Sequence, residues 1–363
     1  MMKILWLNHR DMMHPLSGGA ERTIYEVGRR LAARGHDLHL LSGGWKGSKR
    51  HETMDGIHIH RYGNRVLPLL VNPVFLRYHK DANVIIDDMA HAAPWFSPWL
   101  SKSPGIVFFR HLHARTLNGQ TNARLATALS FIERRYPFIY TSWPFVTESL
   151  SSEEDLNSLG INSSRIFKIP PGVDTNLFKP IQKSEKPSLV YFGGMKPYKR
   201  PEHALAVLRI LLSKGHDISL TMVGEGTSTY TLKSLSHDLG LESKVSFVGK
   251  VTDQELSRVV SSAWVNIHCS RSEGWGLSIT EAAASGTPTV AYKVPGVREN
   301  VVQGQTGILV KDGDISGMAD AIEVVLQTRM TWLQACVSYA NRFSWETTTE
   351  AWERILKIVA ESL

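Results

Sequence analysis

The stretch "WVNIHCSRSEGWGLSITEAAASGTPTVAY", residues 264–292, carries the clearest structural pattern in this chain. It starts with the apolar run "WVNIH" and ends with the apolar run "TPTVAY", and each run predicts a buried strand. Between the two runs lies a glycine-rich loop, and we expect a helix to begin near Leu277. A strand, a loop, a helix and a second strand in this order form the repeating unit of a parallel sheet.

The same alternation occurs in two series, which are separated by a turn-rich stretch near residues 170–180. The first series contains the apolar runs "KILWLN", "DLHLLS", "GIHIHRY", "NVIID", "GIVFF" and "WPFVTES". The second contains "SLVYFGG", "ISLTMVGEG", "VSFVGKV" and the two runs quoted above. We therefore predict an α/β protein with two Rossmann-like domains that face each other across a cleft. The expected domains are an N-terminal one over residues 1–176 and a C-terminal one over residues 177–342.

The composition is that of an ordinary globular protein, with 42% hydrophobic and 21% charged residues in a chain of 363. Its two cysteines, Cys269 and Cys336, are far apart in sequence and are expected to be reduced thiols. The chain has no run of about 18 apolar residues and no secretory signal pattern at its N-terminus. We expect a cytoplasmic protein, with at most a peripheral attachment to the inner face of the cell membrane.

The net charge of +7 comes entirely from the N-terminal half of the chain. Residues 1–180 contain 22 Lys and Arg against 15 Asp and Glu, whereas the remainder contains 19 of each sign. This excess indicates an anionic partner such as a phosphorylated substrate or an anionic membrane. A nucleic acid is not expected, because the chain lacks the basic and aromatic platform that binds single strands.

Two glutamates, Glu273 and Glu281, mark the glycine-rich loop and the helix that follows it. Ligands of open parallel sheets bind beyond the carboxyl ends of the strands, which is where this loop lies. Gly274 and Gly276 allow a ligand to approach the backbone closely, and the start of the helix is a favourable seat for a phosphate. Carboxylates accept hydrogen bonds from sugar hydroxyls, so Glu281 suits a ribose and Glu273 suits a second sugar. The stretch therefore predicts a site for a nucleotide sugar.

The spacing of Glu273 and Glu281 resembles the E-x7-E motif of retaining glycosyltransferases with the GT-B fold, a large family that includes glycogen synthase. Further segments resemble this family in the same order along nearly the whole chain: "SGGAER" (17–22), "IPPGVDTNLF" (169–178), "YFGGMKPYKRPEHAL" (191–205) and "GILVKDGD" (307–314). The resemblance implies that a last helix, over residues 343–363, crosses back to the N-terminal domain. It also implies a hexosyltransferase that needs neither a metal nor another cofactor.

The resemblance assigns catalytic roles to His111, Glu273 and Lys199. The donor-binding residues that it implies are Gly18, Gly19, Lys199, Val251, Glu273, Gly274, Trp275, Gly276, Leu277 and Glu281. The segment departs from the family at Gly194, where an arginine is usual, and Lys196 is the nearby residue that could supply the charge. Arg110 and His113 are alternatives to His111, because the count from the strand "GIVFF" leaves all three open.

The implied reaction moves a hexose from a UDP- or GDP-linked sugar to a hydroxyl of a glycan or lipid-linked acceptor. Three features favour an acceptor at a membrane surface: the +7 excess of the N-terminal half, the tryptophan- and proline-rich segment 91–100, and the segment 133–145, which mixes bases with aromatics. A soluble acceptor with these aromatics buried is the alternative. A nucleotide-sugar 2-epimerase of the same fold is the alternative enzyme.

Other readings of the same motifs are weaker. "SGGAER" lacks the glycine spacing of a dinucleotide-binding loop, and a glycosidase would not need the helix start after Gly276. The Asp-Gly-Asp triplet at 312–314 resembles a metal-binding motif, but Asp314 precedes a helical run and is better interpreted as its N-cap. His111 and His113 have no third ligand at a spacing typical of zinc.

Overall fold

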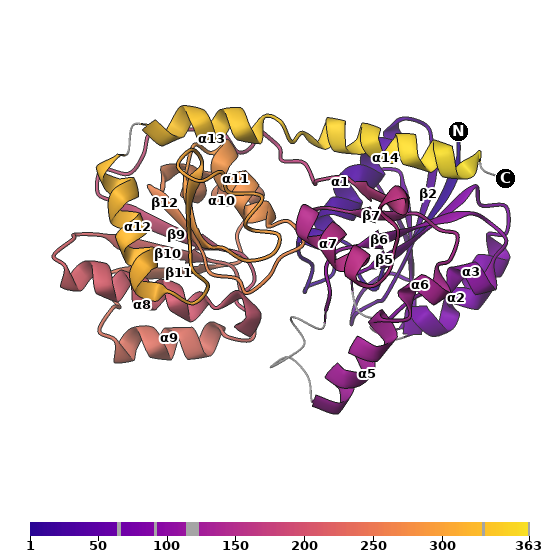
Figure 1. Cartoon of the computed structure of the whole chain (residues 1–363), viewed down its shortest axis with the longest axis horizontal. Helices are drawn as coiled ribbons and strands as arrows, with labels where there is room; N and C mark the ends of the chain where they lie inside the picture. The colour runs from indigo at the N-terminus through magenta and orange to yellow at the C-terminus, as the bar shows by residue number, and fades with distance from the viewer. Residues whose placement is uncertain (64–66, 91–92, 114–122, 329–330, 362–363) are drawn as a thin grey trace. The chain divides into compact units, whose positions relative to one another are not determined.

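The structure, a computed structural model, describes residues 1–63, 67–90, 93–113, 123–328 and 331–361 (Figure 1). The chain divides into two compact units. Unit 1 comprises Met1–Gly172 together with Trp345–Leu363, and unit 2 comprises Val173–Ser344. Each unit is a parallel or nearly parallel sheet with helices packed on it, which confirms the predicted two-domain α/β fold.

The sheet of unit 1 has eight strands in the order β3-β4-β2-β1-β5-β6-β7-β8. All neighbouring strands are parallel except β3 and β4, which form an antiparallel hairpin. The strands are β1 (Lys3–Leu7), β2 (Asp37–Ser42), β3 (His51–Met54), β4 (Ile57–Arg61), β5 (Val84–Met89), β6 (Gly105–Phe109), β7 (Phe145–Thr147) and β8 (Ile166–Lys168). The described helices are α1 (Gly19–Ala33), α2 (Leu67–Tyr78), α3 (Ser97–Leu100), α5 (Ala123–Glu133), α6 (Tyr136–Ile139), α7 (Leu150–Ser158), the 3-10 turn η1 (Ser163–Arg165) and α14 (Trp345–Ala360).

The last helix, α14, packs on the sheet of unit 1 (Figure 1). Its Trp352 is fully buried, and its ring lies 5.2 Å from that of Trp6 and 4.8 Å from that of Phe108. On the same helix, Glu353 forms an ion pair of 2.6 Å with Arg34, the C-cap residue that follows α1. The chain therefore returns to unit 1 after completing unit 2.

The sheet of unit 2 has six parallel strands in the order β11-β10-β9-β12-β13-β14. The strands are β9 (Ser188–Phe192), β10 (Ser219–Val223), β11 (Val245–Gly249), β12 (Val265–His268), β13 (Thr289–Tyr292) and β14 (Gly307–Val310). The helices are the 3-10 turn η2 (Pro197–Lys199), α8 (Pro201–Ser213), α9 (Thr229–Asp238), α10 (Asp253–Ser262), α11 (Leu277–Ala284), α12 (Ile315–Gln327) and α13 (Trp332–Ala340).

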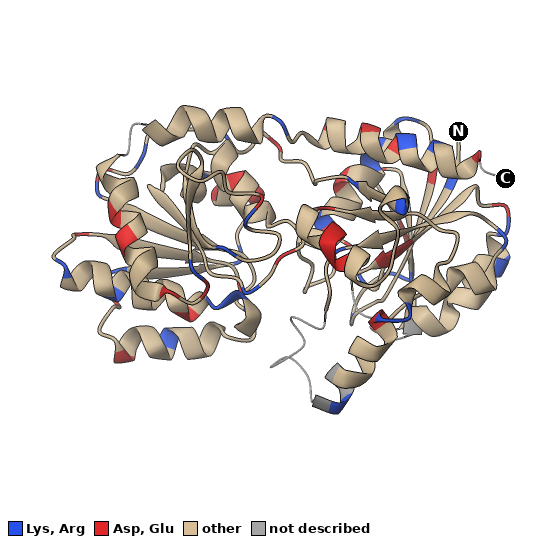
Figure 2. Cartoon of the chain, viewed as in Figure 1, with Lys and Arg blue, Asp and Glu red and all other residues tan. Residues whose placement is uncertain are grey.

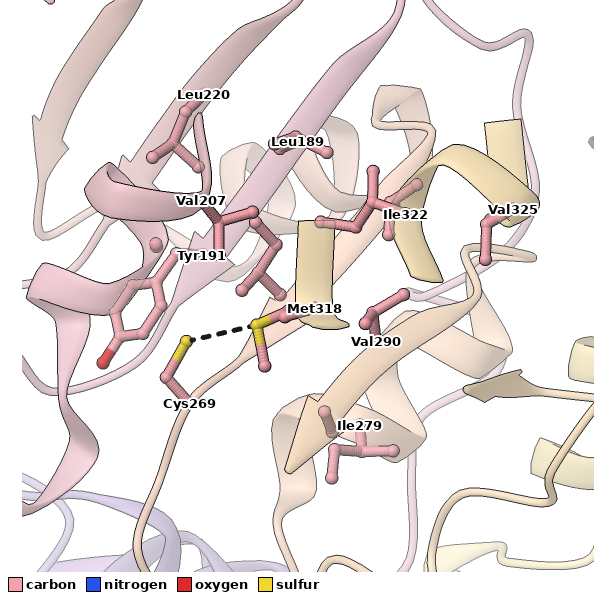
Figure 3. Close-up of a cluster of buried hydrophobic side chains, with 14 of the residues drawn as sticks. Leu189, Tyr191, Val207, Leu220, Cys269, Ile279, Val290, Met318, Ile322 and Val325 are labelled. Carbon is pink, nitrogen blue, oxygen red and sulfur yellow. Dashed lines mark hydrogen bonds between the residues drawn. The ribbon is translucent and has the colours of Figure 1, made fainter. Parts of the chain in front are cut away.

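Both faces of this second sheet are buried, as the apolar strands predict. Alternate side chains of β9 point to opposite faces, so Leu189 and Tyr191 join the large core cluster and Val190 and Phe192 join a smaller one. Figure 3 shows part of the large cluster, in which the Sγ atom of Cys269 lies 3.9 Å from the Sδ atom of Met318. Both cysteines of the chain are buried free thiols, as expected.

The unit boundaries lie a few residues from the predicted ones, at 172/173 and 344/345. The reason is that Val173 packs in the core of unit 2 and forms a β-bridge with Ser344, while its N–H donates to the carbonyl of Phe343 at 2.8 Å. Among the described residues, no helix combines the length and the apolar character needed to span a membrane.

Candidate functional site

Unit 2 has a switch point in its strand order between β9 and β12. From β9 the chain adds β10 and β11 on one side, and then returns to add β12, β13 and β14 on the other. The loops after β9 and β12 therefore leave the same edge of the sheet in opposite directions. Ligands of open α/β sheets bind at such points.

A largely buried ion pair joins these two loops. The Nζ atom of Lys199, from η2 after β9, lies 2.8 Å from the Oε1 atom of Glu273, from the loop after β12. The hydroxyl of Ser270 donates to the same oxygen at 2.6 Å, and the Nε2 atom of His268 lies 3.6 Å from it. Only 13% of the Glu273 side chain and 21% of the Lys199 side chain are exposed.

The charges of this pair stabilise each other. Burial by itself raises the pKa of the Glu273 carboxyl, but the charges of Lys199 and His268 and the hydrogen bonds from Lys199 and Ser270 together outweigh burial and lower this pKa to about 2. In the same way, burial lowers and Glu273 raises the pKa of Lys199, with a net increase. Burial lowers the pKa of His268 to about 4, so this imidazole is neutral at pH 7. At neutral pH Glu273 is therefore a carboxylate that only accepts hydrogen bonds.

The backbone of the Glu273 loop is packed too closely for a side chain at one neighbouring position. Gly296 has a φ of +77°, and a Cβ added to it would lie 2.1 Å from the carbonyl oxygen of Glu273. The N–H of Glu273 donates to the carbonyl of Pro295 at 3.1 Å. Gly276, with a φ of +86°, turns the chain into α11. Gly276 thus allows the turn into α11, and Gly296 allows a later segment to pack closely against the loop that precedes this helix.

A buried asparagine, Asn300, holds the start of α11. Its side-chain N–H groups donate to the carbonyls of Trp275 at 3.0 Å and Gly276 at 3.1 Å. The indole of Trp275 donates to the hydroxyl of Thr280 at 2.9 Å, and this hydroxyl is also 3.2 Å from the amide of Asn300. The sequence analysis missed Asn300, because a single asparagine in "RENVV" gives no signal of its contacts.

The remaining predicted donor residues of unit 2 lie at the same edge of its sheet. Leu277 is the first residue of α11, and Glu281 is a buried residue one turn further along it. Val251 follows β11 and packs against the smaller core cluster. At Gly194, a Cβ would lie 3.5 Å from the Cε atom of Lys196, so the stem of this lysine passes beside the position where the family has arginine.

Arg200, which the sequence analysis did not single out, also binds the loop after β12. It has a φ of +47°, a conformation that costs a side-chain-bearing residue on the order of 1 kcal/mol. Its buried guanidinium donates to the carbonyl of Cys269 at 2.9 Å and that of Ser270 at 3.1 Å, and it pairs with Asp312. Asp314 is the N-cap of α12 and accepts from the N–H of Gly317 at 2.8 Å, as predicted.

In unit 1, Gly18 precedes α1 and Gly19 begins it. The N–H of Gly18 donates to the carboxylate of Glu21 at 2.7 Å. The nearest atom to a Cβ added at Gly18 would be a carboxylate oxygen of Glu21, at 3.8 Å, and the φ of −150° at Gly18 is open to any residue. The packing of unit 1 itself therefore does not require glycine at position 18.

His111 and His113 follow β6 in unit 1, and their rings lie 4.8 Å apart at an angle of 31°. The carboxylate of Glu133 accepts from the N–H of His113 at 2.7 Å and lies 3.3 Å from its Nδ1 atom. The neighbouring Arg110 is buried, and it pairs with Asp88 at 2.8 Å and with Glu148 at 2.6 Å. The guanidinium of Arg110 also donates to the carbonyl of Ala20 at 3.2 Å, next to Gly19.

The strand order and helix packing define the class of protein, which is that of the GT-B glycosyltransferase fold. Sucrose-phosphate synthase from Thermosynechococcus elongatus superposes with a TM-score of 0.85 over 100% of both chains, at 19% sequence identity. HepE of Anabaena, solved in complex with UDP-glucose, superposes with a TM-score of 0.76 over 98% of this chain and 100% of that one, also at 19% identity. At this level of identity the likeness concerns the fold alone.

Two family models cover most of the chain. Residues 173–343 match "Glycosyl transferases group 1", and residues 17–177 match "Glycosyltransferase Family 4". Together the two matches span residues 17–343 and identify a glycosyltransferase with a group 1 domain in its C-terminal half. Among curated proteins, the D-inositol 3-phosphate glycosyltransferase of Paenarthrobacter aurescens (strain TC1) is 32% identical over 214 residues, which are 54% of this chain and 52% of the relative. The chain thus matches about half the length of this relative.

Proposed function

We propose that this chain transfers a hexose from a UDP- or GDP-linked sugar to an acceptor hydroxyl, with retention of configuration and without a metal ion. The observation that carries the proposal is the Lys199–Glu273 ion pair at the switch point of unit 2, next to the loop that leads into α11. The cation and the helix N-terminus suit the diphosphate of a nucleotide sugar, and the carboxylate suits the hydroxyls of its hexose.

The positive groups of this site suit the departing nucleoside diphosphate. The first N–H groups of a helix have no acceptor within the helix, and α11 begins directly after the glycine loop. Together with the ammonium of Lys199, they stabilise the negative charge that develops on the diphosphate as the glycosidic bond breaks. The departing phosphate then accepts the proton of the acceptor hydroxyl, so no protein nucleophile is needed.

The two glutamates are assigned to hydroxyl groups. Glu273, with its pKa near 2, is ionised at neutral pH and is unsuited to the role of the acid in a glycosidase. It accepts instead from hydroxyls of the hexose, and Glu281 accepts from the ribose. Val251, which follows β11, is assigned to the base, with the contact made through its backbone. The proposed sugar transfer is in keeping with the name of the curated relative, a glycosyltransferase, and with the structure of HepE, which was solved in complex with UDP-glucose.

The test separates binding from turnover. Thermal shifts with UDP, GDP and ADP sugars identify the donor, because a specific ligand stabilises the folded state. Glu273→Gln should then reduce turnover far more than affinity for the nucleoside diphosphate. Glu281→Gln should chiefly weaken that affinity, by about 1.5–3 kcal/mol for a charged hydrogen bond. Glu242→Gln, at an exposed position of unit 2, is the control. Equal effects of the two active-site changes on diphosphate affinity would contradict these roles.

His111 is assigned by the resemblance to the hexose of the donor. If this is right, His111→Ala lowers turnover and leaves the affinity for nucleoside diphosphate nearly unchanged. His113→Ala is the matched comparison, since its ring packs against that of His111. A loss of turnover with His113→Ala alone would move the role to His113.

The acceptor is proposed to lie at an anionic membrane surface. On α2, Leu70, Val74 and Tyr78 are spaced by four residues and are all exposed, Tyr78 to 81%. This spacing places them on one face of the helix. Helix α3 contacts α2 and exposes Trp99 to 64%. Exposed apolar side chains of this size are suited to insertion between lipid head groups.

A basic side chain lies beside one of the other exposed aromatic side chains of unit 1. Phe131 and Phe138, at α5 and α6, are exposed, and the guanidinium of Arg135 lies 4.7 Å from the Phe131 ring. Among the described residues, Lys and Arg of unit 1 are spread over several elements and do not form one block (Figure 2).

In the segment 91–100, Trp95 is buried in the core and residues 91–92 lie outside the described part of the chain.

Vesicle sedimentation tests this attachment. The protein should bind anionic vesicles at low salt and lose most of this binding at high salt. Replacement of both Leu70 and Trp99 by serine should weaken binding, whereas Tyr230→Ser, at an exposed site of unit 2, should not. Absence of binding to anionic vesicles at low salt would refute the attachment and favour a soluble acceptor.

A further inference from the structure

Histidines gather at one edge of the sheet in unit 1, and none of them is a residue of the candidate site. β2 contributes His39, β3 contributes His51 and β4 contributes His58 and His60. His79 follows directly after α2, which packs against β2. Nothing in the proposed transfer of a sugar uses these side chains.

The register of the strands explains why the rings meet. His58 and His60 are two residues apart on β4, so their side chains share one face of the sheet. His39 is paired with His58 across the parallel β2–β4 ladder, and His51 is paired with His60 across the antiparallel β3–β4 ladder. Paired residues point to the same face, which therefore carries all four rings.

Three of these imidazoles come close enough to share one ion. One ring nitrogen from each of His39, His60 and His79 lies within 4.8 Å of the others. The Nδ1 atom of His39 and the Nε2 atom of His60 are 3.0 Å apart. Two imidazole nitrogens bound to one tetrahedral zinc ion are about 3.3 Å apart, because each Zn–N bond is about 2.0–2.1 Å. Small rotations of the rings would therefore complete such a geometry.

In His39 and His60, the ring nitrogen that does not face the other ring, here called the outer nitrogen, also has a partner. The Nε2 atom of His39 lies 3.1 Å from a carboxylate oxygen of Asp37, and the Nδ1 atom of His60 lies 3.2 Å from the Nδ1 atom of His51. A histidine that binds a metal usually donates its second N–H to a carboxylate or another acceptor, which fixes the ring. His39 and His60 thus have their outer nitrogens held, with the inner ones directed at each other.

The third ring supplies an unsatisfied group. The Nδ1 atom of His79 is buried and has no hydrogen-bond partner among the described residues. A buried polar nitrogen without a partner costs free energy, which a bound ion would recover.

The protonation state of the cluster is also the one that metals require. Burial, followed by the neighbouring histidines, lowers the pKa of His60 to about 4. Burial and His39 lower the pKa of His79 to about 4, and burial lowers that of His39. Neutral imidazole is the ligand form of histidine, so at neutral pH no proton has to leave before a metal binds.

We propose that His39, His60 and His79 bind one late first-row transition-metal ion, with Zn²⁺ as the ion that best suits three imidazoles. Nitrogen ligands favour zinc, copper, nickel and cobalt over magnesium, calcium and manganese. Three protein ligands leave the fourth position of a tetrahedral ion to water. The ion links strands β2 and β4 to the segment after α2, and it takes no part in the proposed sugar transfer.

Metal binding by the whole chain tests the proposal. Protein stripped with a chelator is dialysed against Zn²⁺, and bound metal is measured by mass spectrometry. Co²⁺ then reports the geometry, since a tetrahedral site with three nitrogens absorbs strongly in the visible range. We expect about one ion per chain and, for His60→Gln, an affinity at least about tenfold lower. His216→Gln and His237→Gln, both in unit 2, are controls and should bind as the wild type does.

Two further variants keep the test decisive if His60→Gln does not fold. His79→Gln removes a ligand outside the sheet. Asp37→Asn removes the carboxylate that lies 3.1 Å from the His39 ring and 3.7 Å from the His58 ring, and it removes no ligand. Both changes should weaken Zn²⁺ binding, the second by about tenfold. Circular dichroism checks that each variant is folded. Less than about 0.1 Zn²⁺ per wild-type chain, or equal binding by wild type and by folded His60→Gln and His79→Gln, would overturn the proposal.

Discussion

Removal of either member of the Lys199–Glu273 pair should destabilise unit 2 by a predictable amount. The pKa of Glu273 falls from 4.5 to about 2 in the folded protein. At about 1.4 kcal/mol per pKa unit, this shift corresponds to about 3 kcal/mol of the free energy of unfolding. The contribution is fully present above pH 4.5, the ordinary value, and is lost as the pH falls toward 2.

A double-mutant cycle measures this coupling at pH 7. The variants are Glu273→Gln, Lys199→Met and the combination of both, and urea titrations give the free energy of unfolding of each. Each single change leaves one buried group without its partner, so each should cost several kcal/mol. The combined change should cost clearly less than the sum, with a coupling energy above the roughly 1 kcal/mol that is typical of surface pairs.

An exposed pair supplies the control. Lys186 and Asp217 lie 2.7 Å apart, nearly the distance of the buried pair, but their side chains are 75% and 56% exposed. Water and salt screen such a pair, so its cycle should show little or no coupling. A coupling energy of less than about 1 kcal/mol for Lys199 and Glu273, the range of surface pairs, would refute the electrostatic description of the site.

Further changes test how the loop before α11 is held. Gly296→Ala should abolish most activity, because its Cβ would lie 2.1 Å from the carbonyl oxygen of Glu273, whereas Gly304→Ala, with a similar φ of +73° but open space around it, should retain activity. Asn300→Ala should lower the free energy of unfolding by about 2 kcal/mol in a urea titration and weaken donor binding, since two buried carbonyls lose their donors. Gly18→Ala should leave the thermal stability nearly unchanged, and a loss of donor affinity in the same variant would place a ligand beside it.

Much of the fold follows from local pattern. The run "GIVFF" matches β6 residue for residue, because a parallel strand covered on both faces is apolar throughout. "DLHLLS" also matches β2 residue for residue, with its leucines buried and Asp37 and His39 only partly buried. The short strand β3 was missed, since "HETM" is mostly polar at the edge of the sheet. The turn Asp55-Gly56, in which both residues have positive φ, is a hairpin signal that could have revealed it.

Contacts between distant segments could not be predicted in the same way. The glutamate and lysine of the candidate site stand out as motif residues, but their 2.8 Å contact depends on the order of β9 and β12 in the sheet. Arg200 gave no signal, because its role rests on a positive φ and on carbonyls some 70 residues away in the chain. The histidine cluster likewise depends on strand register, and the spacing of its members matches no metal motif.

The most direct test of the proposed function is the fate of the nucleotide sugar that the thermal-shift screen selects. The wild-type chain is incubated with this donor alone, and then with the donor and membrane lipid extract, while released nucleoside diphosphate and the sugar product are followed by NMR. The account predicts release of diphosphate in step with an acceptor-linked sugar of unchanged anomeric configuration, and little of either with Glu273→Gln. Conversion of the donor to its 2-epimer without any acceptor, or a product of inverted configuration, would contradict it.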